Sequence, residues 1–148
     1  MLSIGTVVIG VTDMRRAVEF WSEALGYVAI EDRAGPTWTV LEPATGTGTA
    51  LALDLSESPV QEHPRMHLDL TATDATEQEA EVDRLVSLGA VRVDWDLYPD
   101  DPDFVVLADP EGNRFCIIDL SHVDLSVVDL SVVDLSLVDL SVVDLGHG

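Results

Sequence analysis

The sequence contains no lysine, and arginine, its only strongly basic residue, occurs at seven of 148 positions. Against these stand 28 aspartate and glutamate residues, which give a formal net charge of −21 at pH 7. Nucleic acid and anionic membranes repel such a chain, so neither is an expected partner. The acidic residues are spread along the chain, which indicates a solubilising surface and not a single acidic binding patch.

Cysteine is nearly absent, and long apolar runs are missing. The single cysteine, Cys116, excludes a disulfide within the chain and is typical of a reducing compartment, so we expect a cytoplasmic protein. No uncharged apolar stretch is long enough to span a bilayer, and the N-terminus lacks the basic and apolar segments of a secretory signal. A length of 148 residues fits one domain or two small modules with a shared core.

The sequence contains an internal repeat. Residues 6–26 read TVVIGVTDMRRAVEFWSEALG, and residues 67–89 read HLDLTATDATEQEAEVDRLVSLG. Each copy is an apolar strand that ends in Thr-Asp, followed by an amphipathic helix that ends in Leu-Gly. Asp13 and Asp74 are the expected helix caps at the N-terminal ends, and Gly26 and Gly89 close the helices. The repeat predicts two copies of one structural module.

The rest of each copy is rich in strand signals. Strands are expected at 3–11, 27–33, 37–41 and 50–55, and again at 91–95, 104–108 and 114–120. Thr76 and Glu79 match a capping box for the second helix. The order β-α-β-β-β, twice, predicts an α+β fold with mixed sheets and helices on one face. We expect module one at 1–55, a linker with two prolines at 56–65, module two at 66–120 and a tail at 121–148.

The tail repeats a five-residue unit, Val-Asp-Leu-Ser-Val, almost without variation from 123 to 145. A strand does not keep the leucines on one face, because a spacing of five residues moves each leucine to the opposite face from the one before. A helix does not either, because five residues turn it by about 500°. A pentapeptide-repeat β-solenoid would keep them inward, but so few units make little more than one coil. We therefore favour an expanded tandem repeat with little ordered structure.

Three segments carry a family resemblance: VVIGVTDMRRAVEFWSEALGY near the N-terminus, RMHLDL at the start of module two, and VVLADPEGNRFCIID at its end. Together they resemble the glyoxalase, bleomycin-resistance and extradiol-dioxygenase group, the vicinal oxygen chelate superfamily, and most closely its glyoxalase-like domain proteins. The resemblance covers residues 3–119. It implies two βαβββ modules whose sheets curl into a cup, with helices on the outer face and a small-molecule ligand inside. It also implies a divalent metal, held in the superfamily's enzymes by inward side chains.

The implied metal positions depart from the superfamily's usual residues. His67 matches the ligand position on the first strand of module two, whereas Thr6 stands at the equivalent position of module one. Cys116 stands where a glutamate is usual, and Asp54 is the candidate oxygen donor near the end of module one. A set of His67, Cys116 and Asp54 would favour zinc over magnesium. The metal site is therefore predicted to be degenerate, with no cofactor firmly expected and a divalent metal as the alternative.

Strand alternation selects the residues of the ligand cup. It places His67 with Asp69, and Arg114 with Cys116, on one face of their strands. The predicted cup residues are Thr6, Trp38, His67, Asp69, Arg114 and Cys116, and Trp38 or Trp95 could stack on a flat ligand.

Each of these residues also has a structural interpretation. His67 is favoured as a cavity residue whose ring Asp69 holds, over a metal ligand. Cys116 is favoured as a small buried apolar residue, and a Cys-His nucleophilic pair lacks a supporting motif. Arg114 is favoured as a partner in an internal ion pair over a ligand contact. For Trp38, cavity and core are equally favoured, and Trp21 is expected in the core.

Three functions remain open. The first is a metal-poor protein that binds and sequesters a small organic molecule, as bleomycin-resistance-type proteins do. The second is a metal-dependent lyase, isomerase or dioxygenase that uses His67, and the third is a non-catalytic interaction module. The departures at Thr6 and Cys116 favour the first over the second, and the cup motifs favour either over the third. Catalysis itself stays open, as does a homodimer whose modules pair across chains.

Overall fold

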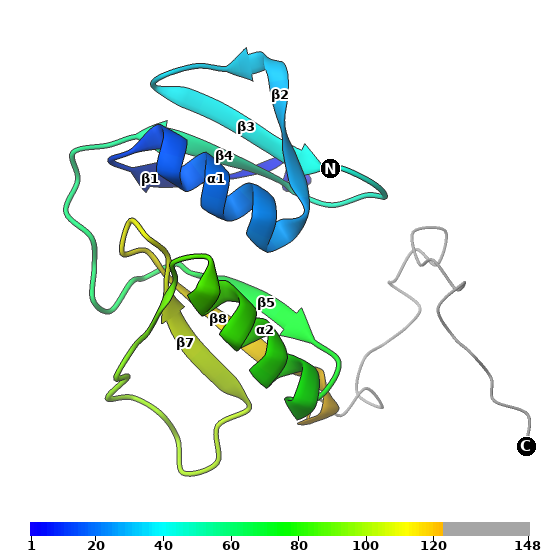
Figure 1. Cartoon of the computed structure of the whole chain (residues 1–148), viewed down its shortest axis with the longest axis vertical. Coiled ribbons are helices and arrows are strands. Elements are labelled where there is room, and N and C mark those ends of the chain that lie inside the picture. The colour runs from blue at the N-terminus through cyan, green and yellow to red at the C-terminus, as the bar shows by residue number, and fades with distance from the viewer. Residues whose placement is uncertain (123–148) are drawn as a thin grey trace, which may run out of the picture.

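The computed structural model describes residues 1–122, so the predictions for the repeat tail fall outside the described residues. Two four-stranded sheets, each with one helix, make up the described chain (Figure 1). The first half contains β1 (Thr6–Val11), α1 (Met14–Leu25), β2 (Tyr27–Ala34), β3 (Trp38–Pro43) and β4 (Ala50–Leu55). The second contains β5 (Leu68–Ala72), α2 (Ala75–Ser87), β6 (Val91–Arg92), β7 (Phe104–Ala108), β8 (Arg114–Asp119) and a 3-10 turn (Leu120–His122). The α+β fold with two βαβββ units is confirmed.

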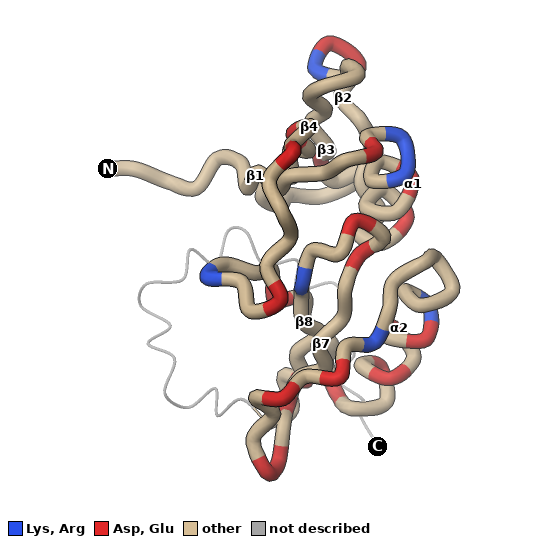
Figure 2. The backbone as a smooth tube through the Cα atoms, turned by 90° about the vertical axis from the view of Figure 1, so that its left-hand side faces the viewer, with Lys and Arg blue, Asp and Glu red and all other residues tan. Residues whose placement is uncertain are grey.

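The two sheets have the same topology. Their strand orders are β1-β4-β3-β2 and β5-β8-β7-β6. In each sheet the first strand pairs in parallel with the last, and the remaining pairs are antiparallel. Figure 2 shows both helices on the same side of the molecule, so neither of these two described helices covers the opposite face of the sheets. No helix among residues 1–122 is long and apolar enough to cross a membrane.

The helix caps follow the repeat, with one correction. Asp13 accepts a hydrogen bond from the Arg16 backbone N–H, and α1 ends at Gly26, whose φ of 65° favours glycine. At α2 the capping box of Thr76 and Glu79 is wrong. Asp74 caps this helix by accepting from the backbone N–H groups of Thr76 and Glu77, because the helix already begins at Ala75.

The Glu77 side chain points back along the chain. Its carboxylate accepts hydrogen bonds of 2.6 Å from the backbone N–H and the hydroxyl of Thr73, and these hydrogen bonds lower the pKa of Glu77. The sequence pattern predicts that Glu79 bonds back to the start of the helix, and in the structure Glu77 has this role.

Three strands are shorter than expected, and β8 by only one residue, since it ends at Asp119. β1 begins at Thr6 and not at residue 3, because its partner β4 begins opposite it at Ala50. β6 ends at Arg92 although a strand was expected to reach residue 95. The backbone N–H of Val93 still donates to the Val106 carbonyl of β7 at 3.1 Å. Further on, the Trp95 ring packs on the His63 ring of the linker with 4.9 Å between centroids.

The main hydrophobic core lies between the sheets and the helices, and a smaller buried cluster of Val40, Ala50 and Ala52 lies on the other face of the first sheet. Trp21 of α1 is 1% exposed, as expected of a core residue, and its ring centroid lies 5.3 Å from that of Phe115 on β8. This contact joins the two modules. Leu68 and Leu70 of β5 pack against the same core, which confirms the register predicted for that strand. The alternate side chains of β5 and β8 therefore face away from the core.

Candidate metal and ligand site

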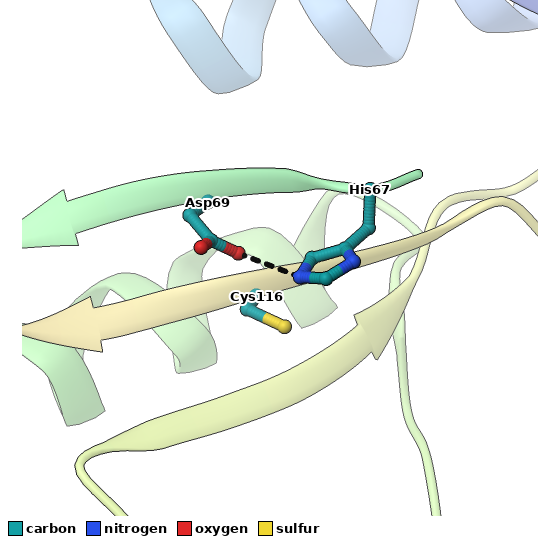
Figure 3. A group of neighbouring side chains, drawn as sticks. All are labelled: His67, Asp69 and Cys116. Atoms are coloured by element: carbon teal, nitrogen blue, oxygen red, sulfur yellow. Dashed lines mark ion pairs between the residues drawn. The ribbon is translucent and has the colours of Figure 1, made fainter. Parts of the chain in front are cut away.

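Three potential metal ligands meet on the face of the second sheet that α2 does not cover. β5 and β8 pair in parallel with Asp69 opposite Cys116, and His67 directly precedes β5. Since side chains alternate along a strand, Leu68 and Phe115 turn to the core while these three turn to the other face. Figure 3 shows His67, Asp69 and Cys116 together in front of the strands, with α2 behind them.

The three side chains are close enough to act as one group. The Nε2 atom of His67 lies 3.1 Å from Oδ1 of Asp69. The contact in which Asp69 holds the His67 ring, expected from the sequence, is therefore present. One potential ligand atom of each residue, including Sγ of Cys116, lies within 4.8 Å of the other two. His67 and Asp69 are about half exposed, whereas Cys116 is 7% exposed.

The Cys116 thiol stays protonated at neutral pH. Burial raises the pKa of Cys116, and the negative charge of Asp69 and a hydrogen bond to it raise it further, to about 12. A thiol in this state is a poor nucleophile, because the thiolate is the reactive form. The raised pKa therefore gives no support to a Cys-His nucleophile and leaves two roles for Cys116, as a small buried residue or as a metal ligand.

A cavity of about 280 Å³ lies over this group. Its polar lining consists of the three side chains and Arg114, and its walls are apolar: Pro64, Trp95, Phe104, Val106 and Ile118. Trp95 was expected near a flat ligand, whereas Phe104 and Val106 were not singled out from the sequence. The antiparallel pairing of β7 with β8 would have indicated them, because it sets Val106 opposite Cys116 and Phe104 opposite Ile118.

Arg114 begins β8 and shares the cavity face with Cys116, two residues further on. The internal ion pair that the sequence favoured for it is wrong: no carboxylate of residues 1–122 lies within 4.0 Å of its guanidinium. Two acidic side chains near it are already engaged, Asp69 with His67 and Glu111 with Arg16. Its Nε atom is buried and has no hydrogen-bond partner among the described residues.

The other predicted cup residues lie in the first sheet. Thr6 of β1 pairs with Ala50, and Trp38 of β3 stands opposite Asp54 of β4. None of Thr6, Trp38 and Asp54 lines the cavity at His67, and Asp54 is not part of the group of potential metal ligands. A cup that brings these residues to His67 stays a prediction.

A second cavity, of about 430 Å³, runs along β1 between the two modules. Val8 and Gly10 line it from β1, Ser58 from the linker, and His67 and Arg114 from module two. His67 and Arg114 thus border both cavities. Residues of module one reach the neighbourhood of the candidate site here, although they add no metal ligand.

Comparisons with known proteins agree on the fold. The family model described as Glyoxalase-like domain matches residues 6–118. No curated protein matches the sequence.

Several solved structures have the same fold. One is a glyoxalase/bleomycin resistance protein/dioxygenase family enzyme from Burkholderia phytofirmans, with a TM-score of 0.62 and 16% identity over 80% of this chain and 98% of that one. Another is a glyoxalase-related enzyme from Fulvimarina pelagi, with a TM-score of 0.60 and 20% identity over 80% of this chain and 88% of that one.

A third is a mutant of the fosfomycin resistance protein FosX from Listeria monocytogenes, complexed with Mn(II) and 1S,2S-dihydroxypropylphosphonic acid. Its TM-score is 0.61, with 15% identity over 80% of this chain and 91% of that one. At these identities the likeness concerns the fold.

Proposed function

This chain belongs to the glyoxalase-like domain family, and we propose that it binds a small organic molecule in the cavity of module two, beside a divalent metal ion. The ion would be held by His67, Asp69 and Cys116. The observation that carries the proposal is the convergence of one nitrogen, one oxygen and one sulfur atom within 4.8 Å of one another at the base of a cavity.

The donor set fits a metal of the zinc type. Imidazole and thiolate suit zinc, whereas magnesium and manganese prefer oxygen ligands. Three protein donors leave an open position in a tetrahedral site, where an oxygen of the ligand can bind. The sequence favoured a metal-poor site because Thr6 and Cys116 depart from the usual ligands, and it offered Asp54 as the oxygen donor. Asp69, on the strand next to Cys116, would be the third donor instead.

Metal binding at this group is coupled to a proton. The Cys116 pKa of about 12 means that the thiol must lose its proton when a metal binds. The proposed affinity therefore rises with pH in the neutral range, by about tenfold per pH unit for one released proton.

A metal-dependent lyase or isomerase is the second candidate function. The observation in its favour is the open coordination position, since a zinc-type ion there would polarise a carbonyl oxygen of the ligand. A dioxygenase is less favoured, because non-haem iron oxygenases use two histidines and a carboxylate, and Cys116 does not belong to that set.

Cobalt(II) titration tests the proposal. Protein freed of metal with EDTA should bind one equivalent of Co(II) and develop a thiolate-to-metal absorption band. Cys116→Ser should remove the band, and His67→Ala should remove stoichiometric binding. His63→Ala is the matched control, because His63 also contacts an aspartate, Asp96, at 2.8 Å but lies outside the group. Absence of stoichiometric metal in the unaltered protein would refute the metal site and favour metal-free sequestration.

A further inference from the structure

We propose that Arg114 is an anion-binding residue and that the ligand of the module-two cavity is a compact organic carboxylate. The proposal deepens the proposed function and rests on it for the location of the ligand. It names the chemical class of that ligand and a residue that would select it.

The first observation is the state of the guanidinium. Four of the seven arginines, Arg15, Arg16, Arg84 and Arg92, have ion-pair partners among the described residues. Arg33 and Arg65 have none, and both are exposed to solvent. Arg114 combines the two properties that matter, since it is partly buried and also lacks an ion-pair partner within residues 1–122.

A guanidinium in this position has an unmet requirement. Its buried Nε–H donates to no described atom, and leaving a charged donor unsatisfied away from water costs roughly tenfold to a hundredfold in an equilibrium constant. A carboxylate can accept from Nε–H and a terminal N–H at once, in the two-point geometry that arginine favours. An anionic ligand would thus satisfy the donor that has no partner in the described part of the chain.

The second observation is the composition of the cavity around it. The walls of Trp95, Phe104, Val106 and Ile118 are apolar, and the volume is about 280 Å³. This volume lies just below the usual range for small-molecule pockets, so the ligand is compact. The combination of apolar walls with a guanidinium that has no ion-pair partner within residues 1–122 fits a flat or branched apolar body that carries a carboxylate.

The third observation is the charge of the protein. Figure 2 shows acidic residues on most elements and few basic ones, and the net charge of the chain is −21. Such a surface repels anions in general. An anion that binds here therefore requires a local cation, and Arg114 is the arginine that faces the cavity.

The placement of Arg114 also suggests how the ligand is oriented. Arg114 and Cys116 are two residues apart on one face of β8, and His67 borders the same cavity. A carboxylate at Arg114 would leave the rest of a small ligand beside the group of His67, Asp69 and Cys116. The apolar body would then lie on β7, against Phe104 and Val106.

Nuclear magnetic resonance of arginine side chains tests the inference. In nitrogen-15-labelled protein, the Nε–H signal of Arg114 is the one that is missing from Arg114→Gln. Benzoate should shift this signal, and its uncharged isostere benzamide should not. The signals of Arg33 and Arg65 serve as internal controls for unspecific ion binding. Arg114→Gln should bind benzoate about tenfold or more weakly, whereas Arg33→Gln should bind it unchanged.

Each titration is done with EDTA and again with one equivalent of zinc, which separates this inference from the proposed metal site. Benzoate binding that needs Arg114 in EDTA supports the inference even where zinc does not bind, and only the metal site then fails. Benzoate binding that Arg114→Gln leaves unchanged overturns the inference and leaves the metal site standing. Equal affinity for benzamide, or no binding of benzoate under either condition, also overturns it.

Discussion

The carboxylate of Glu111, on the turn between β7 and β8, lies 2.6 Å from the guanidinium of Arg16 on α1 and so joins the two modules. It also accepts hydrogen bonds from the backbone N–H groups of Thr12 and Asp13 and from the Thr12 hydroxyl. The Glu111 side chain is 2% exposed. Burial alone would raise the pKa of Glu111, but the hydrogen bonds from Thr12 and Arg16 outweigh it and lower the pKa. A residue of module two thus holds Thr12 and the N-cap residue Asp13, which directly precede the helix of module one.

Glu111→Ala should lower the free energy of unfolding by about 2 kcal/mol, because it leaves the backbone donors at Thr12 and Asp13 without their partner. Denaturant unfolding followed by circular dichroism measures the change. Glu19→Ala is the matched control, since it removes an ion pair with Arg15 whose two side chains are largely exposed. The control should cost less than about 0.5 kcal/mol. Equal losses of stability in the two variants would contradict the role of Glu111 in holding the start of α1.

The same contact predicts a pH dependence. The pKa of Glu111 is lower in the folded than in the unfolded state, so its stabilisation is complete above the unfolded value and is lost as the pH falls through the folded value. The stability difference between the unaltered protein and Glu111→Gln should therefore shrink below about pH 4. Unfolding midpoints at pH 7 and at pH 3 measure it. A difference that grows on acidification would mean that the folded pKa is raised.

The fold could be predicted from the sequence where local signals repeat. Asp13 and Asp74 each follow a strand and begin a helix, and the two copies gave the order of all ten helices and strands. The length of β6 was overestimated, because the alternation of apolar and polar residues continues to Trp95. In the structure the Trp95 ring packs on His63 of the linker. That contact joins residues far apart in the chain, and periodicity along one strand carries no information on it.

The candidate site was predictable to the extent that it depends on one strand at a time. Alternation correctly set His67 and Asp69 on one face and Leu68 on the other. Strand pairing decides which carboxylate lies next to Cys116. The parallel register of β5 and β8 places Asp69 there, whereas Asp54 lies in the other sheet. The lack of an ion-pair partner for Arg114 among residues 1–122 could not be predicted either, since acidic residues surround it in the sequence and engage elsewhere in the structure.

Cys116 should react slowly with iodoacetamide, and Asp69→Asn should make it react faster. At a pKa of about 12, roughly one thiol in ten thousand is ionised at pH 8. Removing the charge of Asp69 lowers this pKa and increases the thiolate fraction. Mass spectrometry follows the alkylation of metal-free protein over a range of pH. Asp54→Asn, an exposed residue of the other sheet, should leave the rate unchanged. An equal rate in the two variants would show that Asp69 does not hold the thiol in its protonated form.

Trp21→Phe should destabilise the protein although it preserves an aromatic ring. The Nε1–H of Trp21 donates to Oδ2 of Asp109 at 3.0 Å, and both residues are buried. Burial raises the pKa of Asp109, and its hydrogen bonds, including that from Trp21, partly offset the rise. Loss of the donor should cost about 1 to 3 kcal/mol in denaturant unfolding. Trp38→Phe is the control, because Trp38 is 40% exposed, and its cost should stay below about 0.5 kcal/mol. A similar loss of stability in Trp21→Phe and Trp38→Phe would mean that Trp21 stabilises the protein through its aromatic ring and not through its N–H group.

A truncation after His122 should retain the fold, because every strand of both sheets ends by Asp119. The cut must lie beyond Ser121, whose backbone N–H donates to the Asp119 carboxylate at 2.8 Å. Hydrogen bonds from the side chain and then the backbone of Ser121 lower the pKa of Asp119. Thermal melting should therefore give a midpoint within about 5 °C of that of the full chain, which corresponds to about 1 kcal/mol. A truncation after Asp119 is the control and should melt lower than the one after His122. A loss of more than about 5 °C on truncation after His122 would show that residues 123–148 contribute to the stability of the domain.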